Sequence, residues 1–284
     1  MPSIKVIPND KLYTSEPPPQ WFGNPGNPRH DEAWTNENWL KSRFHFNFAE
    51  YHNRNNPSFG VLRVLNDDLV QPRRGFGAHP HRDMEILTYI VEGKLTHQDN
   101  TGSKESLGRG SIQFMTAGTG IRHSEFNHQD TPLRFVQVWI MPRSRGLPPK
   151  YGSYDAGRDD ATATKNGLRH LASDVNNHAA ETPVALNQDV DCFAAELEVD
   201  RSLSLDVPEG RQAYLLCVEG SLEVNGAELD RHDAAEIVGG PGPLRIRSTR
   251  VEDTEGGKVA HLLVLVMKEQ PGSGRTDVAP PERT

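Results

Sequence analysis

A chain of 284 residues is longer than one ordinary β domain and leaves room for two domains of about 100–150 residues each. The net charge is -8, with 39 acidic and 31 basic residues, which argues against direct binding to nucleic acid. No apolar run approaches the roughly 20 residues that cross a bilayer, and the start lacks the apolar core of a secretion signal, so we expect a soluble protein of the cytoplasm, or of the nucleus in a eukaryote.

The first forty residues contain three consecutive prolines at 17–19 and a segment rich in Asn, Gly and Pro. Such composition favours turns over regular strands. We therefore predict that residues 1–40 form an irregular arm that packs on the first domain, and we assign no chemistry to it.

Short apolar segments separated by turn residues follow from Phe44 onward, among them EILTYIVEG and LRFVQVWIM. This pattern is typical of antiparallel strands. It predicts a first domain over 41–155, a break rich in Gly, Asp and Thr, a second domain over 165–268 and a flexible polar tail over 269–284. The fold class is therefore all-β, with two antiparallel β-barrel, jelly-roll-like domains in tandem.

An internal repeat supports two copies of one fold. The segment 83–96 resembles 211–224 when Gly93 is aligned with Gly220, and each is followed by a turn and another strand. In this alignment His79, His81 and Glu85 correspond to Asp206, Pro208 and Gln212. We therefore expect the second domain to lack a histidine site.

Two pairs of possible metal ligands stand in the first domain. His79 and His81 are two residues apart, as are His123 and Glu125, and residues two apart on a strand share a face. With 12 histidines in the chain, one His-x-His pair is expected by chance about 0.5 times, so the second pair carries the argument. Three imidazoles and one carboxylate suit a mid-series divalent transition metal with two open positions.

We do not assign direct metal binding to the other polar residues nearby. Glu85 lies four residues after His81, and we favour a role in accepting a hydrogen bond from a ligand or a substrate over direct metal binding. Five further residues have no second candidate ligand at a comparable spacing, and we expect them at exposed polar positions; these are His45, His52, His97, His128 and Glu92.

At these residues the chain resembles the pirin family of the cupin superfamily, above all the bacterial pirin-type quercetin 2,3-dioxygenases. The resemblance rests on GFGAHPHRDMEILTYIVEGKLTHQD, GSIQFMTAGTGIRHSEFN and VQVWIMP. It implies a bicupin fold whose metal ligands are His79, His81, His123 and Glu125, with Glu85 outside the ligand set. The ion implied is one divalent metal, Fe(II) first, with Mn, Co, Ni, Cu or Zn as alternatives.

The activity implied is cleavage of a flavonol or related enol by O2, a small aromatic substrate being bound beside the metal. Glu125 or Glu85 would act as the catalytic base that accepts the enol proton, and ring cleavage would release carbon monoxide and a depside. We expect the cavity to be lined from Phe46, Phe76, Met84, Phe114 and Phe126.

Two alternatives stay open. Animal pirins are described as nuclear iron proteins that assist transcription factors, so this chain could be a regulatory module with a protein partner. It could also be another enzyme on the same fold, such as a sugar isomerase or a thiol or diketone dioxygenase. We expect a monomer.

Overall fold

The structure is a computed structural model that describes residues 1–26, 39–159 and 164–270. Strands dominate these ranges, which contain one short helix, α1 (Ala156–Asp159), and two 3-10 turns, η1 (Asn9–Lys11) and η2 (Pro19–Phe22). None of the described helices has the length and apolar character needed to pass through a membrane. The predicted all-β class is confirmed.

The chain divides into two compact domains, each built from discontinuous segments. The N-terminal domain comprises Tyr13–His52 and Leu62–Asp159. The C-terminal domain comprises Met1–Leu12, Asn53–Val61 and the described residues after Asp159. The boundary after Asp159 falls between the predicted domains 41–155 and 165–268. The predicted continuous first domain is wrong at Asn53–Val61, which belong to the C-terminal domain.

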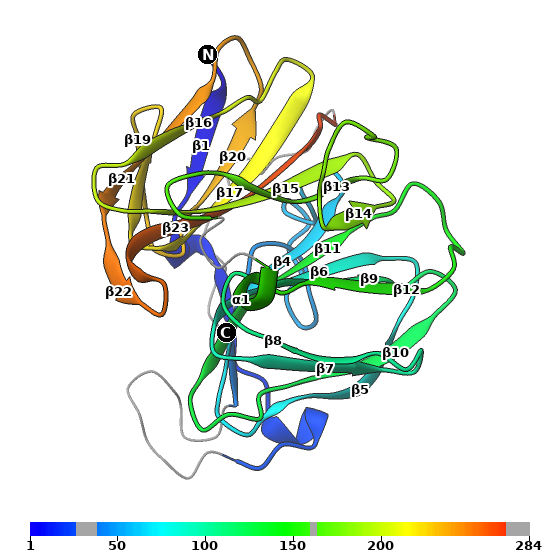
Figure 1. Ribbon diagram of the computed structural model, residues 1–284. Helices are drawn as coiled ribbons and strands as arrows, with labels where there is room; N and C mark the ends of the chain where they lie inside the picture. The colour runs from blue at the N-terminus through cyan, green and yellow to red at the C-terminus, as the bar shows by residue number, and fades with distance from the viewer. Residues whose placement is uncertain (27–38, 160–163, 271–284) are drawn as a thin grey trace. The chain divides into compact units, whose positions relative to one another are not determined.

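The N-terminal domain consists of two antiparallel sheets, most of whose strands are labelled in Figure 1. The larger sheet has the strand order β12 (Lys150–Tyr154), β9 (Ile112–Thr116), β6 (Glu85–Glu92), β11 (Leu133–Ile140), β4 (Leu62–Val70), β3 (Leu40–Phe44) and β2 (Tyr13–Ser15). The smaller has the order β5 (Gly75–His81), β10 (Ile121–Phe126), β7 (Leu95–Asp99) and β8 (Lys104–Leu107). Buried side chains from both sheets form one core that includes Ile90, Leu95 and Phe135.

The C-terminal domain repeats this arrangement, except that the last two strands of its larger sheet pair in parallel. Its larger sheet has the order β1 (Ser3–Ile7), β20 (Ala234–Val238), β17 (Arg211–Glu219), β23 (Gly257–Lys268), β15 (Val190–Leu197), β13 (Arg169–Asp174) and β14 (Val184–Leu186), with β22 (Glu252–Thr254) paired to β23. Its smaller sheet has the order β16 (Ser202–Leu205), β21 (Leu244–Arg250), β18 (Ser221–Val224) and β19 (Ala227–Asp230). The sheets of each domain do not close into a ring, so both have the double-sheet, jelly-roll form of the predicted architecture.

The sequence repeat marks equivalent corners of the two domains. Gly93 joins β6 to β7 and Gly220 joins β17 to β18, and both adopt positive φ, 77° and 71°. A Cβ at either glycine would meet a backbone carbonyl oxygen, at 2.7 Å for Gly93 and 2.4 Å for Gly220. Only glycine fits these positions without strain.

The prediction of an irregular arm over 1–40 is wrong at several positions. Residues Ser3–Ile7 form β1, which pairs with β20 of the C-terminal domain, and Tyr13–Ser15 form β2 at the edge of the N-terminal sheet. The alternating apolar residues Ile4, Val6 and the buried Ile7 give this segment strand character that its proline-rich surroundings obscured. Residues 27–38 of the predicted arm, and 271–284 of the predicted tail, lie outside the described residues.

Candidate metal centre and adjoining cavity

Two neighbouring strands of the smaller sheet position the candidate ligands. On β10, burial alternates, so that His123 and Glu125 point inward while Arg122 is exposed. On β5, His79 and His81 are half-buried and Ala78 is exposed. The antiparallel register places His123 directly opposite His79.

The three histidine rings surround a common point. Ring centroids lie 4.7 Å apart for His79 and His81, 4.6 Å for His79 and His123, and 4.8 Å for His81 and His123. Each ring offers a nitrogen within 4.8 Å of the others. Glu125 belongs to an overlapping group with His123 and His97 that meets the same limit, and it lines the same cavity as His79 and His81.

The protonation of these rings suits metal binding. Nδ1 of His79 lies 2.7 Å from the carbonyl oxygen of Gly77, a contact in which Nδ1–H donates and Nε2 keeps its lone pair. Nε2 of His81 and of His123 is shielded from solvent and has no hydrogen-bond partner among the described residues. Burial lowers the pKa of His81 to about 3 and of His123 to about 2, so both rings are neutral at pH 7. Unpartnered, neutral imidazole nitrogens that converge are the donors a divalent metal requires.

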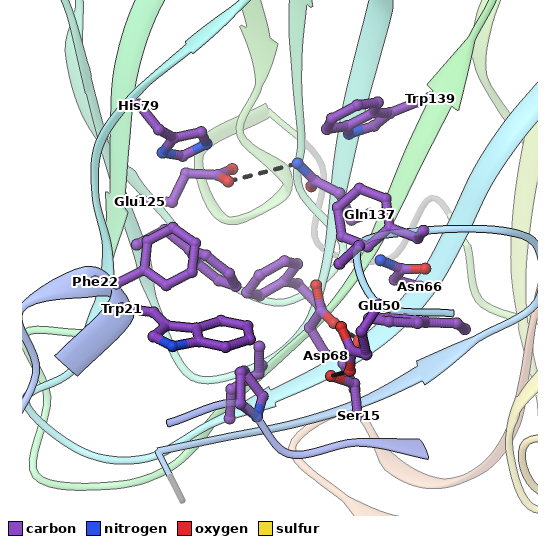
Figure 2. Close-up of a pocket in the computed structure, with 18 of the residues that line it drawn as sticks. Ser15, Trp21, Phe22, Glu50, Asn66, Asp68, His79, Glu125, Gln137 and Trp139 are labelled. Carbon is purple, nitrogen blue, oxygen red and sulfur yellow. Dashed lines mark hydrogen bonds between the residues drawn. The ribbon is translucent and has the colours of Figure 1, made fainter. Parts of the chain in front are cut away.

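Glu125 is held by three polar side chains. Its Oε1 accepts hydrogen bonds from Gln113 (2.5 Å) and Thr88 (3.1 Å), and its Oε2 accepts one from Gln137 (3.4 Å), which is drawn in Figure 2. Burial raises its pKa to about 7 despite these bonds. The carboxyl is thus fixed in orientation and can take or release a proton near neutral pH.

The sequence interpretation missed His97, which was expected to be exposed. It is buried, its Nε2 contacts Asp99 Oδ2 at 3.0 Å, and its Nδ1 lies 3.4 Å from Nδ1 of His123. If Nε2–H of His97 donates to Asp99, its Nδ1 accepts from His123, whose Nε2 then faces the candidate metal. The two-residue spacing of His97 and Asp99 is the signal that could have revealed it.

A cavity of about 310 Å³ adjoins the cluster (Figure 2). Its wall is mostly aromatic and aliphatic, with polar groups at opposite ends. The lining side chains are Ser15, Pro17, Trp21, Phe22, Leu40, Ser42, Phe44, Phe48, Ala49, Glu50, Asn66, Asp68, Phe76, His79, His81, Glu125, Phe135, Gln137 and Trp139. A volume of this size accommodates a small aromatic ligand.

The predicted cavity wall needs correction. Phe76 lines the cavity, whereas the other four predicted residues do not; these are Phe46, Met84, Phe114 and Phe126. Phe46 and Phe114 are buried in the protein interior instead.

The segment 1–40, to which no chemistry was assigned, supplies part of the wall through Ser15, Trp21 and Phe22. The ring of Phe22 meets that of His79 edge to face, with centroids 6.2 Å apart. These residues belong to β2 and η2, which the compositional argument did not predict.

Two further expectations differ in outcome. Glu85 is fully buried at the start of β6, outside the groups of converging ligand atoms and outside the cavity wall. Its predicted catalytic role stays a prediction. His45 is buried rather than exposed, whereas His52 and His128 are exposed as expected.

The site's residues fall within a recognised protein family. The Pirin family matches residues 27–140, and a quercetinase C-terminal cupin domain matches 172–254. A pirin-like protein of Caulobacter vibrioides is 39% identical over 217 residues, 76% of this chain and 90% of the relative. The chain belongs to the pirin family.

Other pirin relatives agree in sequence and in structure. The quercetin 2,3-dioxygenase of Escherichia coli is 38% identical over 208 residues, 73% of this chain and 86% of the relative. The crystal structure of YhhW from Escherichia coli has a TM-score of 0.74 and 29% identity, covering 93% of this chain and 97% of that one. A second structure, of bacterial pirin YhhW in complex with nickel(II), has a TM-score of 0.72 and 28% identity, covering 94% and 99%. The bicupin fold is therefore that of bacterial pirins.

Proposed function

We propose that this pirin is a metal-dependent dioxygenase that cleaves a flavonol or a related enol with O2. The observation that carries the proposal is the cavity, which brings a largely aromatic wall to the histidine cluster. A cavity of this kind accommodates a planar aromatic ligand, and a purely regulatory metal site would not need one. The name of the Escherichia coli relative, quercetin 2,3-dioxygenase, supports the same chemistry.

We assign His79, His81, His123 and Glu125 as the ligands of one divalent metal, Fe(II) in our proposal. The nickel(II) complex of the related bacterial pirin supports a divalent ion of this series. When bound, such an ion supplies Lewis acidity and open positions for an enol oxygen and for O2.

The protein's own groups would orient and deprotonate the substrate. Glu125 lines the cavity beside the histidines and is the preferred acceptor of the enol proton, and Gln113, Thr88 and Gln137 keep its oxygens in place. Aromatic side chains on either side of the histidines would hold the planar ligand and exclude water. Among them Trp139 packs edge to face on His81, with centroids 4.8 Å apart.

The test is oxygen consumption by iron-reconstituted protein with quercetin, beside a metal-stripped sample. Wild type should consume oxygen and bleach the flavonol absorbance only when loaded with metal. His79→Ala should lose metal and uptake together, whereas the matched variant His128→Ala, at an exposed position, should retain both.

Two results would count against the proposal. Uptake by His79→Ala at undiminished metal content would refute the ligand assignment. No uptake by wild type with its full metal complement would refute the activity and favour a regulatory protein with a protein partner.

A further inference from the structure

The cavity has a second polar region away from the histidine cluster. Figure 2 shows Asn66, Asp68, Glu50 and Ser15 gathered on one side of the pocket, separated from His79. Glu50 is exposed and accepts a hydrogen bond from Ser15 at 2.5 Å, whereas Asn66 and Asp68 are buried. The polar groups therefore extend from solvent into the cavity wall.

Strand register connects this region to the candidate metal centre. Asn66 on β4 lies opposite Gln137 on β11, and Gln137 donates to Glu125. Neighbouring strands are about 4.8 Å apart, so Asn66 lies one strand beyond the group that holds Glu125. Asp68, two residues along β4, projects from the same face about 7 Å further on. A ligand of two or three fused or linked rings spans this distance.

Asn66 is buried with an unused acceptor. The residue is 3% exposed, and its Oδ1 has no hydrogen-bond partner within the described part of the chain. Buried polar atoms in native proteins are nearly always hydrogen-bonded, so an unsatisfied acceptor on a cavity wall is available to a water molecule or to a ligand. Phe44, its neighbour across β3, has only an apolar ring to offer. A hydrogen-bond donor on a ligand would satisfy Asn66.

The surroundings of Asp68 favour a neutral hydrogen-bond donor on the ligand over a cationic group. Ser42 donates to its Oδ1, and the adjacent Asp67 takes the guanidinium of Arg134 through two bonds, of 2.8 and 2.7 Å. Burial raises the pKa of Asp68 to about 8, so its carboxyl is protonated at neutral pH. A protonated carboxyl both donates and accepts, which matches a hydroxyl group better than an ammonium group.

We propose that Asn66 and Asp68 form a specificity site that binds hydroxyl groups on the substrate ring farthest from the histidine cluster. The inference rests on the proposed function and deepens it. The preferred substrates are aromatic enols whose distal ring carries one or two hydroxyls, and the aromatic wall alone binds the ring skeleton.

The experiment measures anaerobic binding, by calorimetry, of three flavonols with no, one or two hydroxyls on the pendant ring to the metal-loaded full-length protein. Wild type should bind about threefold to tenfold more tightly for each added hydroxyl. Asn66→Leu, which keeps the side-chain size, should reduce that gain to less than about twofold per hydroxyl. Asn66→Ala serves if the leucine variant does not fold, and metal content is measured for every variant.

Phe44→Leu is the matched control, because it alters the neighbouring wall without removing a polar group. It should weaken binding of all three flavonols by a similar factor. Equal hydroxyl gains in wild type and Asn66→Leu would overturn the inference, as would tighter binding of a pendant-ring ammonium analogue than of the hydroxyl compound. Oxygen uptake with the same KM for all three flavonols would also overturn the inference, but it would leave the dioxygenase proposal intact. If no flavonol bound at all, both the inference and the dioxygenase proposal would be refuted.

Discussion

The interiors of the two domains occupy the same strand framework with opposite chemistry. In the N-terminal domain Glu125 pairs across the smaller sheet with His97, four residues after Gly93. In the C-terminal domain the equivalent pair is Ile246 and Val224, the latter four residues after Gly220. Both apolar residues are fully buried. A position that holds a carboxylate in one copy therefore holds a hydrocarbon in the other.

The same replacement applies to the histidines. His123 faces His79 on the neighbouring strand, and the equivalent partners are Leu244 and Leu205. Strand pairing thus aligns His79 with Leu205, one residue from the Asp206 suggested by the sequence repeat. Within the described residues, the groups of converging ligand atoms lie in the N-terminal domain. That the second domain lacks a histidine site stays a prediction. The same strand framework therefore holds polar groups in one domain and apolar side chains in the other.

Exchanging equivalent residues between the two domains should give the largest changes in metal binding and in stability. His123→Leu should weaken metal binding more than about 100-fold while leaving the unfolding temperature of the metal-free protein unchanged or higher, because a buried unpartnered nitrogen is removed. Leu244→His should destabilise the protein by about 3 kcal/mol, because it buries an imidazole in a hydrocarbon core. Metal analysis and denaturant unfolding measure both. Equal destabilisation by the two variants would contradict the comparison.

His97→Phe tests whether the residue beside the cluster acts through His123. The phenyl ring should keep the stacking on Tyr151, whose ring lies 4.5 Å away, but it removes the acceptor for His123. We expect metal affinity to fall about 10- to 100-fold, measured by competition with a chelator. Tyr151→Phe, which loses only the hydroxyl bond to Glu105, is the control and should keep the affinity. Unchanged affinity in His97→Phe would remove His97 from the site.

Asp68→Asn should change how stability depends on pH. The folded-state pKa of Asp68 is raised to about 8, so this carboxyl stabilises the folded protein below its unfolded pKa, and that contribution is lost as the pH rises through 8. The variant cannot ionise there, and relative to wild type it should gain about 2 kcal/mol between pH 6 and 8. Urea unfolding at a series of pH values measures the difference. Parallel curves would show that Asp68 is already ionised at pH 6.

The smallest effect on metal binding should come from the two corner glycines, where substitution acts on stability instead. Gly93→Ala and Gly220→Ala each force an L residue into the left-handed region, at a cost of about 1–2 kcal/mol, and the clash of the new Cβ with a backbone carbonyl adds to this cost. The two losses should be similar because the corners are equivalent. Chemical denaturation of each single variant tests this, and a loss confined to one of them would show that the corners have diverged.

The metal cluster was the part most accessible from sequence. The two-residue spacing within each pair identifies the candidate ligands, because residues two apart on a strand share a face. These ligands are His79, His81, His123 and Glu125. The cavity wall was not accessible in this way. Trp21 and Phe44 reach it from β2–η2 and β3, whereas the buried Phe46 shows that an aromatic residue near the site in sequence need not line the cavity. The direction in which a side chain points from a strand depends on the pairing register, and local composition does not specify that register.

Asn66 and Asp68 illustrate a second limit. In the sequence they belong to LRVLNDDLV, where polar residues suggest a turn, and only the pairing of β4 with β3 and β11 shows that they are interior positions of a central strand. Asp67 between them forms its ion pair with Arg134 instead. Whether such residues are buried depends on pairing with strands that are distant in the sequence. A local sequence pattern holds no information on that pairing.

The pairing of β1 with β20 has a consequence for truncation of the chain. Lys5 pairs with Glu236, so the contact that covers this edge of the C-terminal sheet joins two segments far apart in the sequence. Without β1, β20 would present an open edge, the kind of surface that invites association with other chains. A fragment that lacks Ser3–Ile7 would carry this unprotected edge permanently. The strand β1 thus protects the C-terminal domain against edge-to-edge association.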